Sequence, residues 1–180
     1  MQETNPVYKQ NAHQFKASFD MLTKVITICV IILFITIGMI SVRSLATAPG
    51  DATDVFALSV VLFFPVATLV VSYLFSTQYY LIRNNEFVIK RLIGEKRISI
   101  PDIDEIRLVA KGEMRGTIRT FGSGGLFGYY GKFYNKTLGS MTFYTTRRTN
   151  RVYIRTKGGN KIIISPDDLN FVDALKSNRS

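Results

Sequence analysis

Two long apolar runs in the N-terminal half dominate the hydrophobic pattern of the chain. The first holds 18 uncharged residues between Lys24 and Arg43, and the second holds 28 between Asp54 and Arg83. A helix rises about 1.5 Å per residue, so the first run reaches roughly 27 Å, close to the hydrocarbon thickness of a bilayer. Each run therefore predicts a transmembrane helix.

The flanks of the first run favour a helix that stays in the membrane. Lys24 and Arg43 can reach the headgroups at its opposite ends. A cleaved signal peptide is the alternative, because Ala46 and Ala48 form an A-x-A pattern beyond the run. However, Pro49 would directly follow the cut and the run is longer than a usual signal, so the sequence favours a retained anchor.

A short connection joins the two runs, so the sequence predicts a helical hairpin. Residues 43–54 include Pro49 and Gly50, which suit a tight turn. Only one Lys or Arg lies in this connection, whereas three precede the first run and several follow the second. By the positive-inside rule both termini face the cytoplasm and the loop faces outward. We predict a multi-pass membrane protein.

The leader before the hairpin, residues 1–24, has two interpretations. Phe15, Phe19 and Leu22 recur at helical spacing, which predicts a short amphipathic helix along the inner membrane surface. Alternatively, these residues are a polar leader that runs directly into the first helix. The hairpin then occupies residues 25–76, and residues 77–180 form one soluble domain.

Beyond residue 77, short runs rich in Val, Ile, Tyr and Phe alternate with turn residues, which is typical of consecutive antiparallel strands. Strands are predicted at residues 79–83, 87–92, 97–100, 103–109, 140–146, 151–156 and 161–165. The alternation in residues 151–155 predicts that Val152 and Ile154 face a core while Arg151 and Arg155 face water.

One helix is predicted at the C-terminal end of this domain. Ser165 is expected to be its N-cap, with Pro166 in the first turn. Leu169, Val172 and Leu175 lie along one side of the helix, so this apolar side needs a surface to cover. We expect the helix to close an open end of a strand barrel.

The order of elements, about seven short strands and one terminal amphipathic helix after a membrane hairpin, resembles the bacterial pleckstrin-homology-like (PH-like) domain family. The resemblance covers roughly residues 77–178 and is carried by RTFGSGGLFGYYGKFYNKTLGSMTFYTTRRTNRVYIRT and IIISPDDLNFVDAL. It implies a mainly-β PH-like barrel of about seven antiparallel strands closed by a C-terminal helix, held at the bacterial inner (cytoplasmic) membrane. The family has no agreed catalytic or ligand-binding motif, so the resemblance implies no site residues.

The excess positive charge belongs to the predicted soluble domain. The formal net charge is +10, and residues 83–180 hold 19 basic and 9 acidic side chains, which by itself gives +10. Cys29 and His13 are single residues of their types, so no intramolecular disulfide or Cys/His zinc set can form. The carboxylates at 102–105 and 167–168 suit turns and a helix start. We predict no metal, no cofactor and no enzyme activity.

Residues 121–134 alternate glycines with aromatic residues, but they fit neither common phosphate-loop pattern. One interpretation is a structural connection whose rings pack on the barrel. The other is an interfacial aromatic loop, with Phe127, Tyr129 and Tyr130 as candidates, that dips into the membrane surface beside the helices.

Basic residues near this segment predict an anion or lipid-headgroup patch. The candidates are Lys132, Lys136, Arg147, Arg148 and Arg151. Anionic lipids of the inner leaflet attract such residues at about 1 kcal/mol for each charge near the surface. Solvated turn charges are the simpler interpretation of the same residues. Nucleic acid is the rival anion, but a membrane tether disfavours it.

The sequence thus predicts a non-catalytic membrane protein whose PH-like domain binds or scaffolds at the cytoplasmic membrane face. The partner is a protein, a second copy of the chain, or anionic lipid headgroups. The alternative is a subunit or assembly factor of a larger membrane complex. No small-molecule substrate is indicated.

Overall fold

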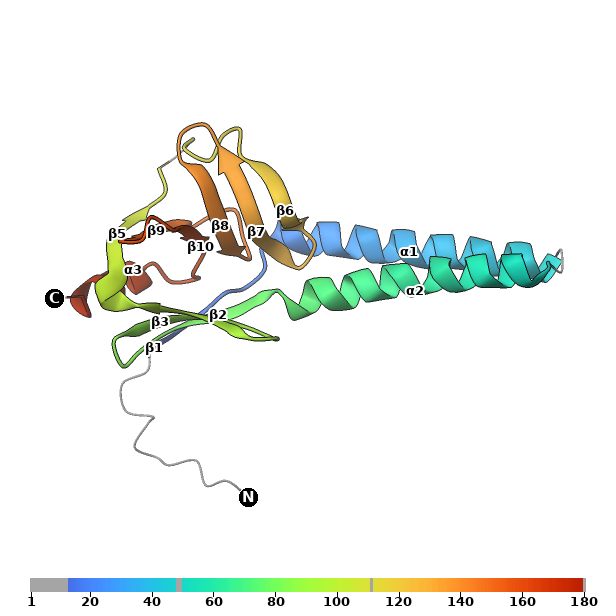
Figure 1. Cartoon of the computed structure of the whole chain (residues 1–180), viewed down its shortest axis with the longest axis horizontal. Helices are drawn as coiled ribbons and strands as arrows, with labels where there is room; N and C mark the ends of the chain where they lie inside the picture. The colour runs from blue at the N-terminus through green and yellow to red at the C-terminus, as the bar shows by residue number, and fades with distance from the viewer. Residues whose placement is uncertain (1–12, 48–49, 111, 180) are drawn as a thin grey trace, which may run out of the picture.

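The computed structural model describes residues 13–47, 50–110 and 112–179 (Figure 1). Helices α1 (Met21–Thr47) and α2 (Ala52–Leu74) run side by side and project from a mostly-β domain of two sheets. Asp51 starts α2, because its carboxylate accepts hydrogen bonds from the backbone N–H groups of Thr53 and Asp54. By length and composition both helices could cross a membrane. The predicted pair of long apolar helices is confirmed.

The first sheet is antiparallel, with the strand order β1-β2-β3-β4. Its strands are β1 (His13–Lys16), β2 (Thr77–Arg83), β3 (Glu86–Arg91) and β4 (Glu95–Ser99). Strand β1 precedes α1 and β2 follows α2, yet the two strands pair, with Lys16 opposite Tyr79. The two ends of the helical hairpin therefore leave from neighbouring strands.

The leader differs from the predicted amphipathic helix. Phe15 lies in β1 and Leu22 lies in α1, so the spacing of the apolar residues does not mark one continuous helix. The ring of Phe15 packs edge-on against Phe171, with 5.2 Å between ring centroids, so the core of the domain accommodates this residue. Residues 1–12 of the leader lie outside the described residues.

The second sheet has the order β5-β9-β10-β8-β7-β6. Its strands are β5 (Ile103–Leu108), β6 (Ile118–Gly125), β7 (Gly128–Asn135), β8 (Gly139–Thr145), β9 (Val152–Thr156) and β10 (Lys161–Ile164). The expectation of antiparallel strands throughout is wrong at one pair, because β8 and β10 run parallel. After β8 the chain skips one place in the sheet, and β10 returns to fill it between β8 and β9.

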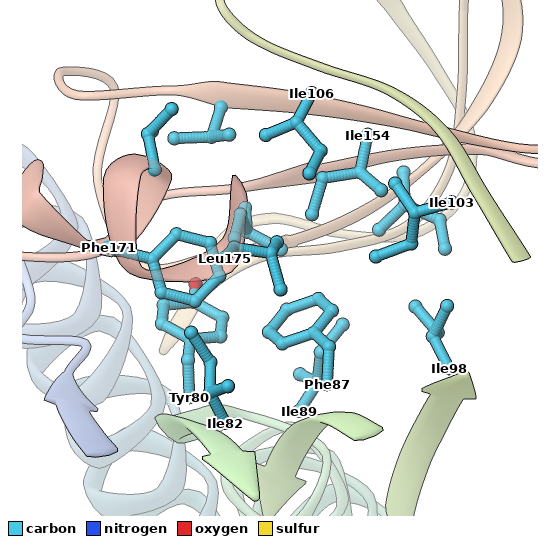
Figure 2. Packing of buried hydrophobic residues seen from close by; sticks show 14 of the residues in the cluster. Tyr80, Ile82, Phe87, Ile89, Ile98, Ile103, Ile106, Ile154, Phe171 and Leu175 are labelled. Carbon is cyan, nitrogen blue, oxygen red and sulfur yellow. The ribbon is translucent and has the colours of Figure 1, made fainter. Parts of the chain in front are cut away.

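The main core lies between the two sheets and is completed by α3 (Asn170–Ser177), as Figure 2 shows. Its largest fully buried side chains include Tyr80, Ile82, Phe87, Ile89, Ile103, Ile154 and Phe171. A second cluster covers the other face of the second sheet, where Phe133 and Phe143 stack with 4.1 Å between ring centroids. Both faces of this sheet therefore carry buried apolar side chains.

The expected closed barrel is not what the described residues form. Strands β4 and β5 follow each other through a short 3-10 helix, η2 (Ile100–Asp102), but they belong to different sheets. Nine strands follow α2 in the described part of the chain, where about seven were expected, because residues 118–135 add β6 and β7 to the second sheet. The result is two open sheets with α3 packed into the core between them.

Ser165 is not the N-cap of the C-terminal helix. Its hydroxyl is buried and accepts hydrogen bonds from the backbone N–H groups of Thr146 (2.9 Å) and Arg147 (3.3 Å). The helix begins later, where Asp168 Oδ1 accepts a hydrogen bond from Asn170 N at 2.9 Å. Ser165 instead ties the end of β10 to the end of β8.

The glycine–aromatic segment forms a β-hairpin, whereas a structural connection or an interfacial loop was predicted. Gly122 and Gly131 face each other across β6 and β7, and both have positive φ. A Cβ on Gly122 would lie 2.2 Å from the carbonyl oxygen of Tyr130, and one on Gly131 would lie 2.3 Å from that of Phe121. Glycine is required at both positions because any side chain would collide with the opposite backbone.

Candidate anion-binding site

The tip of the β6–β7 hairpin rests against the domain-proximal ends of the two apolar helices. The backbone N–H of Phe127 donates to the Thr27 hydroxyl of α1 at 3.2 Å, and the Phe127 ring lies 5.3 Å from the ring of Tyr73 of α2. The Tyr130 hydroxyl donates to the carbonyl oxygen of Ser72 at 3.0 Å. The hairpin therefore holds the helices and the β domain in a defined orientation.

Two of the three candidate aromatic residues contact the helices and one does not. Phe127 and Tyr130 are partly buried in the contacts with α1 and α2, whereas Tyr129 is buried on the opposite face of the sheet. This difference follows from the alternation of side chains along β7. Entry of Phe127 into a membrane surface stays a prediction.

The structure does not bring the five candidate basic residues together. Lys132 points to the face of the second sheet that turns toward the first sheet, where its ammonium donates to Thr142 Oγ1 at 2.9 Å. Lys136 is exposed in the β7–β8 turn. Arg147, Arg148 and Arg151 all come from the β8–β9 connection, but Arg147 pairs with Asp167 whereas Arg148 and Arg151 line one cavity. The single patch predicted from the sequence is therefore divided.

Arg147 connects segments of the domain, and its contact with a lipid headgroup stays a prediction. Its guanidinium forms an ion pair with Asp167 and donates to the carbonyl oxygen of Ser18 at 3.1 Å. The Asp167 carboxylate also accepts hydrogen bonds from the Ser18 backbone N–H (2.9 Å) and hydroxyl (2.5 Å). This network fastens the segment between β1 and α1 to the β domain.

Arg148 and Arg151 line a cavity of about 530 Å³ on the outer face of the second sheet, and Arg119 of β6 lines it with them. Arg148 Nε donates to the Tyr129 hydroxyl at 2.9 Å. The guanidinium carbon of Arg151 lies 5.3 Å from the Phe143 ring centroid. No Asp or Glu of the described residues lines this cavity. We call it the outer arginine cavity.

Arg151 is the most enclosed of these three arginines. Its Nε is buried and has no hydrogen-bond partner among the described residues. Burial lowers the pKa of Arg151 from its ordinary value, because a charged guanidinium loses hydration there. The prediction that Arg151 faces water is wrong, since Arg151 folds over the aromatic cluster. An anion entering the cavity would replace the lost hydration.

Asp20 limits the positive charge at one edge of the outer arginine cavity. Its carboxylate accepts hydrogen bonds from the backbone N–H groups of Thr23 (2.8 Å) and Arg148 (2.9 Å). Burial raises the pKa of this carboxyl, but the hydrogen bonds from Thr23 and Arg148 outweigh burial, so that the pKa lies below its usual value. Asp20 therefore stays ionised and fixes the start of α1 beside the cavity.

Lys132 lines a different cavity, of about 550 Å³, between the two sheets. Lys96, Arg97, Lys157 and Asp102 line it as well. The other carboxylates of the 102–105 group form ion pairs, Asp104 with Arg155 at 2.7 Å and Glu105 with Arg107 at 2.9 Å. These acidic residues have structural roles that account for their positions.

Three arginines of the β domain that line cavities, Arg91, Arg97 and Arg119, were not among the site residues predicted from the sequence. Arg119 adjoins the glycine-rich segment, which gave no strand signal, so its direction was not predictable. The direction of the Arg91 side chain could have been predicted from the sequence. It follows Phe87 and Ile89 at a spacing of two, the repeat of side chains on one face of a strand, and both of these residues are 0% exposed.

A comparison with known proteins gives one family match for the β domain. The family described as "Bacterial PH domain" matches residues 78–179, more than half of the chain. The chain belongs to the bacterial PH domain family. A search of curated proteins and a search of solved structures gave no match. PH domains are generally non-catalytic, which is consistent with the prediction of no enzyme activity. Strand β1 and both apolar helices lie before the matched residues.

Proposed function

We propose that the chain is a non-catalytic PH-domain protein anchored in the bacterial cytoplasmic membrane. Helices α1 and α2 cross the bilayer as a hairpin, and the PH-like domain and both termini lie in the cytoplasm. There the domain binds anionic lipid headgroups of the inner leaflet and positions the protein on that surface.

The observation that carries the proposal is the exposure of the two apolar helices. Thr23 is the one buried residue of α1 in the described structure, and α2 has none. Phe56, Phe63 and Phe64 are 70%, 71% and 69% exposed. A core helix of a soluble protein buries most of its apolar side chains, whereas these helices present theirs to the surroundings. A lipid environment accounts for such a surface.

The distribution of charge supports lipid headgroups as the partner. The outer arginine cavity lies beside the start of α1, because Arg148 binds Asp20 through its backbone N–H. An arginine at this level is close to the phosphates of the leaflet that α1 enters. Self-association and a protein partner are the other candidates, and the lipid is favoured because the bilayer is already adjacent.

A specific observation favours a second candidate, a subunit of a larger membrane complex. Between α1 and α2 lies an apolar groove of about 530 Å³, lined by Phe34, Gly38, Leu62 and Pro65 among others. A transmembrane helix of another protein would fit such a groove by van der Waals packing of apolar side chains. Extraction in mild detergent should then give a stoichiometric companion protein.

The anchoring proposal is tested by membrane extraction and by paired reporter fusions. We expect the full-length protein to stay in the pellet after carbonate washing. A reporter active only in the cytoplasm should work when fused after Ser180 and fail when inserted after Gly50, and a reporter active only in the periplasm should show the opposite. Release by carbonate, or the same reporter activity at both positions, would refute the hairpin.

A further inference from the structure

Arg91 ends the row of core-facing side chains on β3. Phe87 and Ile89 point into the core between the sheets (Figure 2), and Arg91 continues that face at the end of the strand. Its guanidinium carbon lies 5.5 Å from the ring centroid of Phe75 and 6.0 Å from that of Tyr144. A positive charge therefore occupies the position where the core opens toward the end of α2.

No protein group of the described structure neutralises Arg91. Its Nε is buried and has no hydrogen-bond partner. Glu95, the acidic residue of the same hairpin, pairs with Lys90 at 3.3 Å and with Arg97. None of the ion pairs between described residues includes Arg91. A sheltered cation without a counter-charge is costly unless another anion pairs with it.

A cavity of about 600 Å³ lies over Arg91. One wall is the end of α2, with Val71 and Ser72, and the Phe75 that follows it. The facing wall is formed by strands β6 to β8, with Phe121 and Tyr130. Arg119 borders the cavity from β6, but its side chain lies on the outer face of the sheet against Gly124. No Asp or Glu of the described residues lines the cavity. The volume suits a small ligand of about headgroup size. We call this cavity the Arg91 cavity.

The Arg91 cavity continues into the apolar surface of α2. Thr68 and Val71 line it and lie within the helix, and Val71 is 52% exposed. Beside it, the β3–β4 turn is fixed to the end of α2, because Ile93 N donates to the carbonyl oxygen of Leu74 at 3.1 Å. In that turn Leu92 and Ile93 are 45% and 51% exposed. An apolar border therefore surrounds a cationic centre where α2 meets the domain.

We propose that the Arg91 cavity binds one anionic phospholipid. The phosphate pairs with the Arg91 guanidinium, and one acyl chain follows Val71 and Thr68 along α2. This inference rests on the proposed membrane anchoring, since the lipid enters from the leaflet that α2 crosses. The bound lipid then fixes the domain at a set depth on the membrane surface.

The lining distinguishes a lipid from a water-soluble phosphate. Free phosphate is hydrated on all sides, whereas Val71, Phe75 and Phe121 offer apolar surface next to the guanidinium. A phospholipid has the same division, with a charged headgroup joined to apolar chains. The cationic centre favours an anionic headgroup over a zwitterionic one, because a choline ammonium would be repelled by Arg91.

The test is native mass spectrometry of the full-length protein in mild detergent, titrated with dioleoyl-phosphatidylglycerol or dioleoyl-phosphatidylcholine. We expect one phosphatidylglycerol per chain, bound at least about tenfold more tightly than phosphatidylcholine. Arg91→Gln should weaken phosphatidylglycerol binding about tenfold. The matched control is Arg115→Gln, which removes the same charge from an exposed turn and should leave binding unchanged.

A second variant keeps the test independent of Arg91. Val71→Trp fills the apolar wall without changing any charge, so it should also weaken phosphatidylglycerol binding. Equal binding of the two lipids by the native protein, or no effect of either variant, would overturn the proposal. Competition by glycerol 3-phosphate at equal concentration would show a free phosphate site, and a bound polypeptide would show a protein site. All four results leave membrane anchoring intact, whereas release of the protein by carbonate refutes the anchoring itself.

Discussion

Replacing Phe171 by alanine tests whether α3 holds the two sheets together. Phe171 is 0% exposed, and its ring contacts three strands of the first sheet at centroid distances of 5.2 Å to Phe15, 5.3 Å to Phe87 and 6.1 Å to Tyr80. Removing a buried phenylalanine costs about 3–5 kcal/mol. For a domain of roughly a hundred residues, each kcal/mol lowers Tm by about 4–8 °C. We therefore expect the Tm of the β domain to fall by at least about 12 °C.

The assay must report on the β domain and not on the apolar helices. The chain has nine tyrosines and no tryptophan, and seven of the tyrosines lie in residues 77–179, so near-ultraviolet circular dichroism of tyrosine follows the domain in detergent. Leu169→Ala is the matched control, because Leu169 precedes the same helix and is 37% exposed. This control should cost less than about 1 kcal/mol. Equal losses from the two substitutions would refute the role given to α3.

Two further predictions concern an ion pair and a glycine. The hydrogen bonds that Arg107 donates to Glu113 hold the pKa of that carboxyl below its ordinary value of 4.5. The ionised carboxylate therefore stabilises the fold above pH 4.5, and this stabilisation is lost as the pH falls through the lowered pKa. Thermal unfolding at pH 7 and pH 3.5 should therefore show a smaller acid-induced decrease of Tm in Glu113→Gln than in the native protein. An equal decrease of Tm in the two proteins would contradict the pairing. Gly131→Ala should destabilise the domain by about 1–3 kcal/mol in urea unfolding, since φ is +111° and the new Cβ meets the Phe121 carbonyl. Gly158→Ala is its control, with no contact closer than 3.9 Å and an expected change within about 0.5 kcal/mol.

Strong local patterns predicted most of the secondary structure. The two uncharged runs gave α1 and α2, and the branched and aromatic runs gave β2, β3, β5, β8, β9 and β10 close to their observed limits. These signals are local, because each depends on the period of side chains within one segment. The family also followed from the order of such segments, and its match over residues 78–179 confirms it.

The missed strands lack such local signals. Strand β1 has four residues, and it pairs with β2 more than sixty residues later in the sequence, for instance Phe15 with Tyr80. Strands β6 and β7 are rich in glycine, which weakens the hydrophobic alternation and normally disfavours a strand. In both cases pairing with another strand determines the structure, and the sequence pattern of the segment alone does not predict that pairing.

The candidate site was predicted by residue type but not by arrangement. Charge along the sequence identifies Arg147 and Arg148 as basic neighbours, but it does not reveal that Asp167, twenty residues away from Arg147, forms an ion pair with it. Side-chain alternation along β7 places Lys132 on the face of the sheet opposite the outer arginine cavity. This alternation was not predictable, because the glycines of β7 weaken the sequence pattern of a strand. Arg91 was the detectable omission, because its period-two relation to Phe87 and Ile89 is local.

The pairing of β1 with β2 makes the helical hairpin an insertion into a β-hairpin. Lys16 and Tyr79 are cross-strand partners, so the chain leaves the sheet, passes through both long helices and comes back to the adjacent position. A water-soluble version could thus be engineered by deleting residues 21–74 and closing the gap with a short loop. By contrast, a fragment cut at residue 78 would lose the edge strand and the Phe15 ring, and would expose the side of β2 that β1 covers.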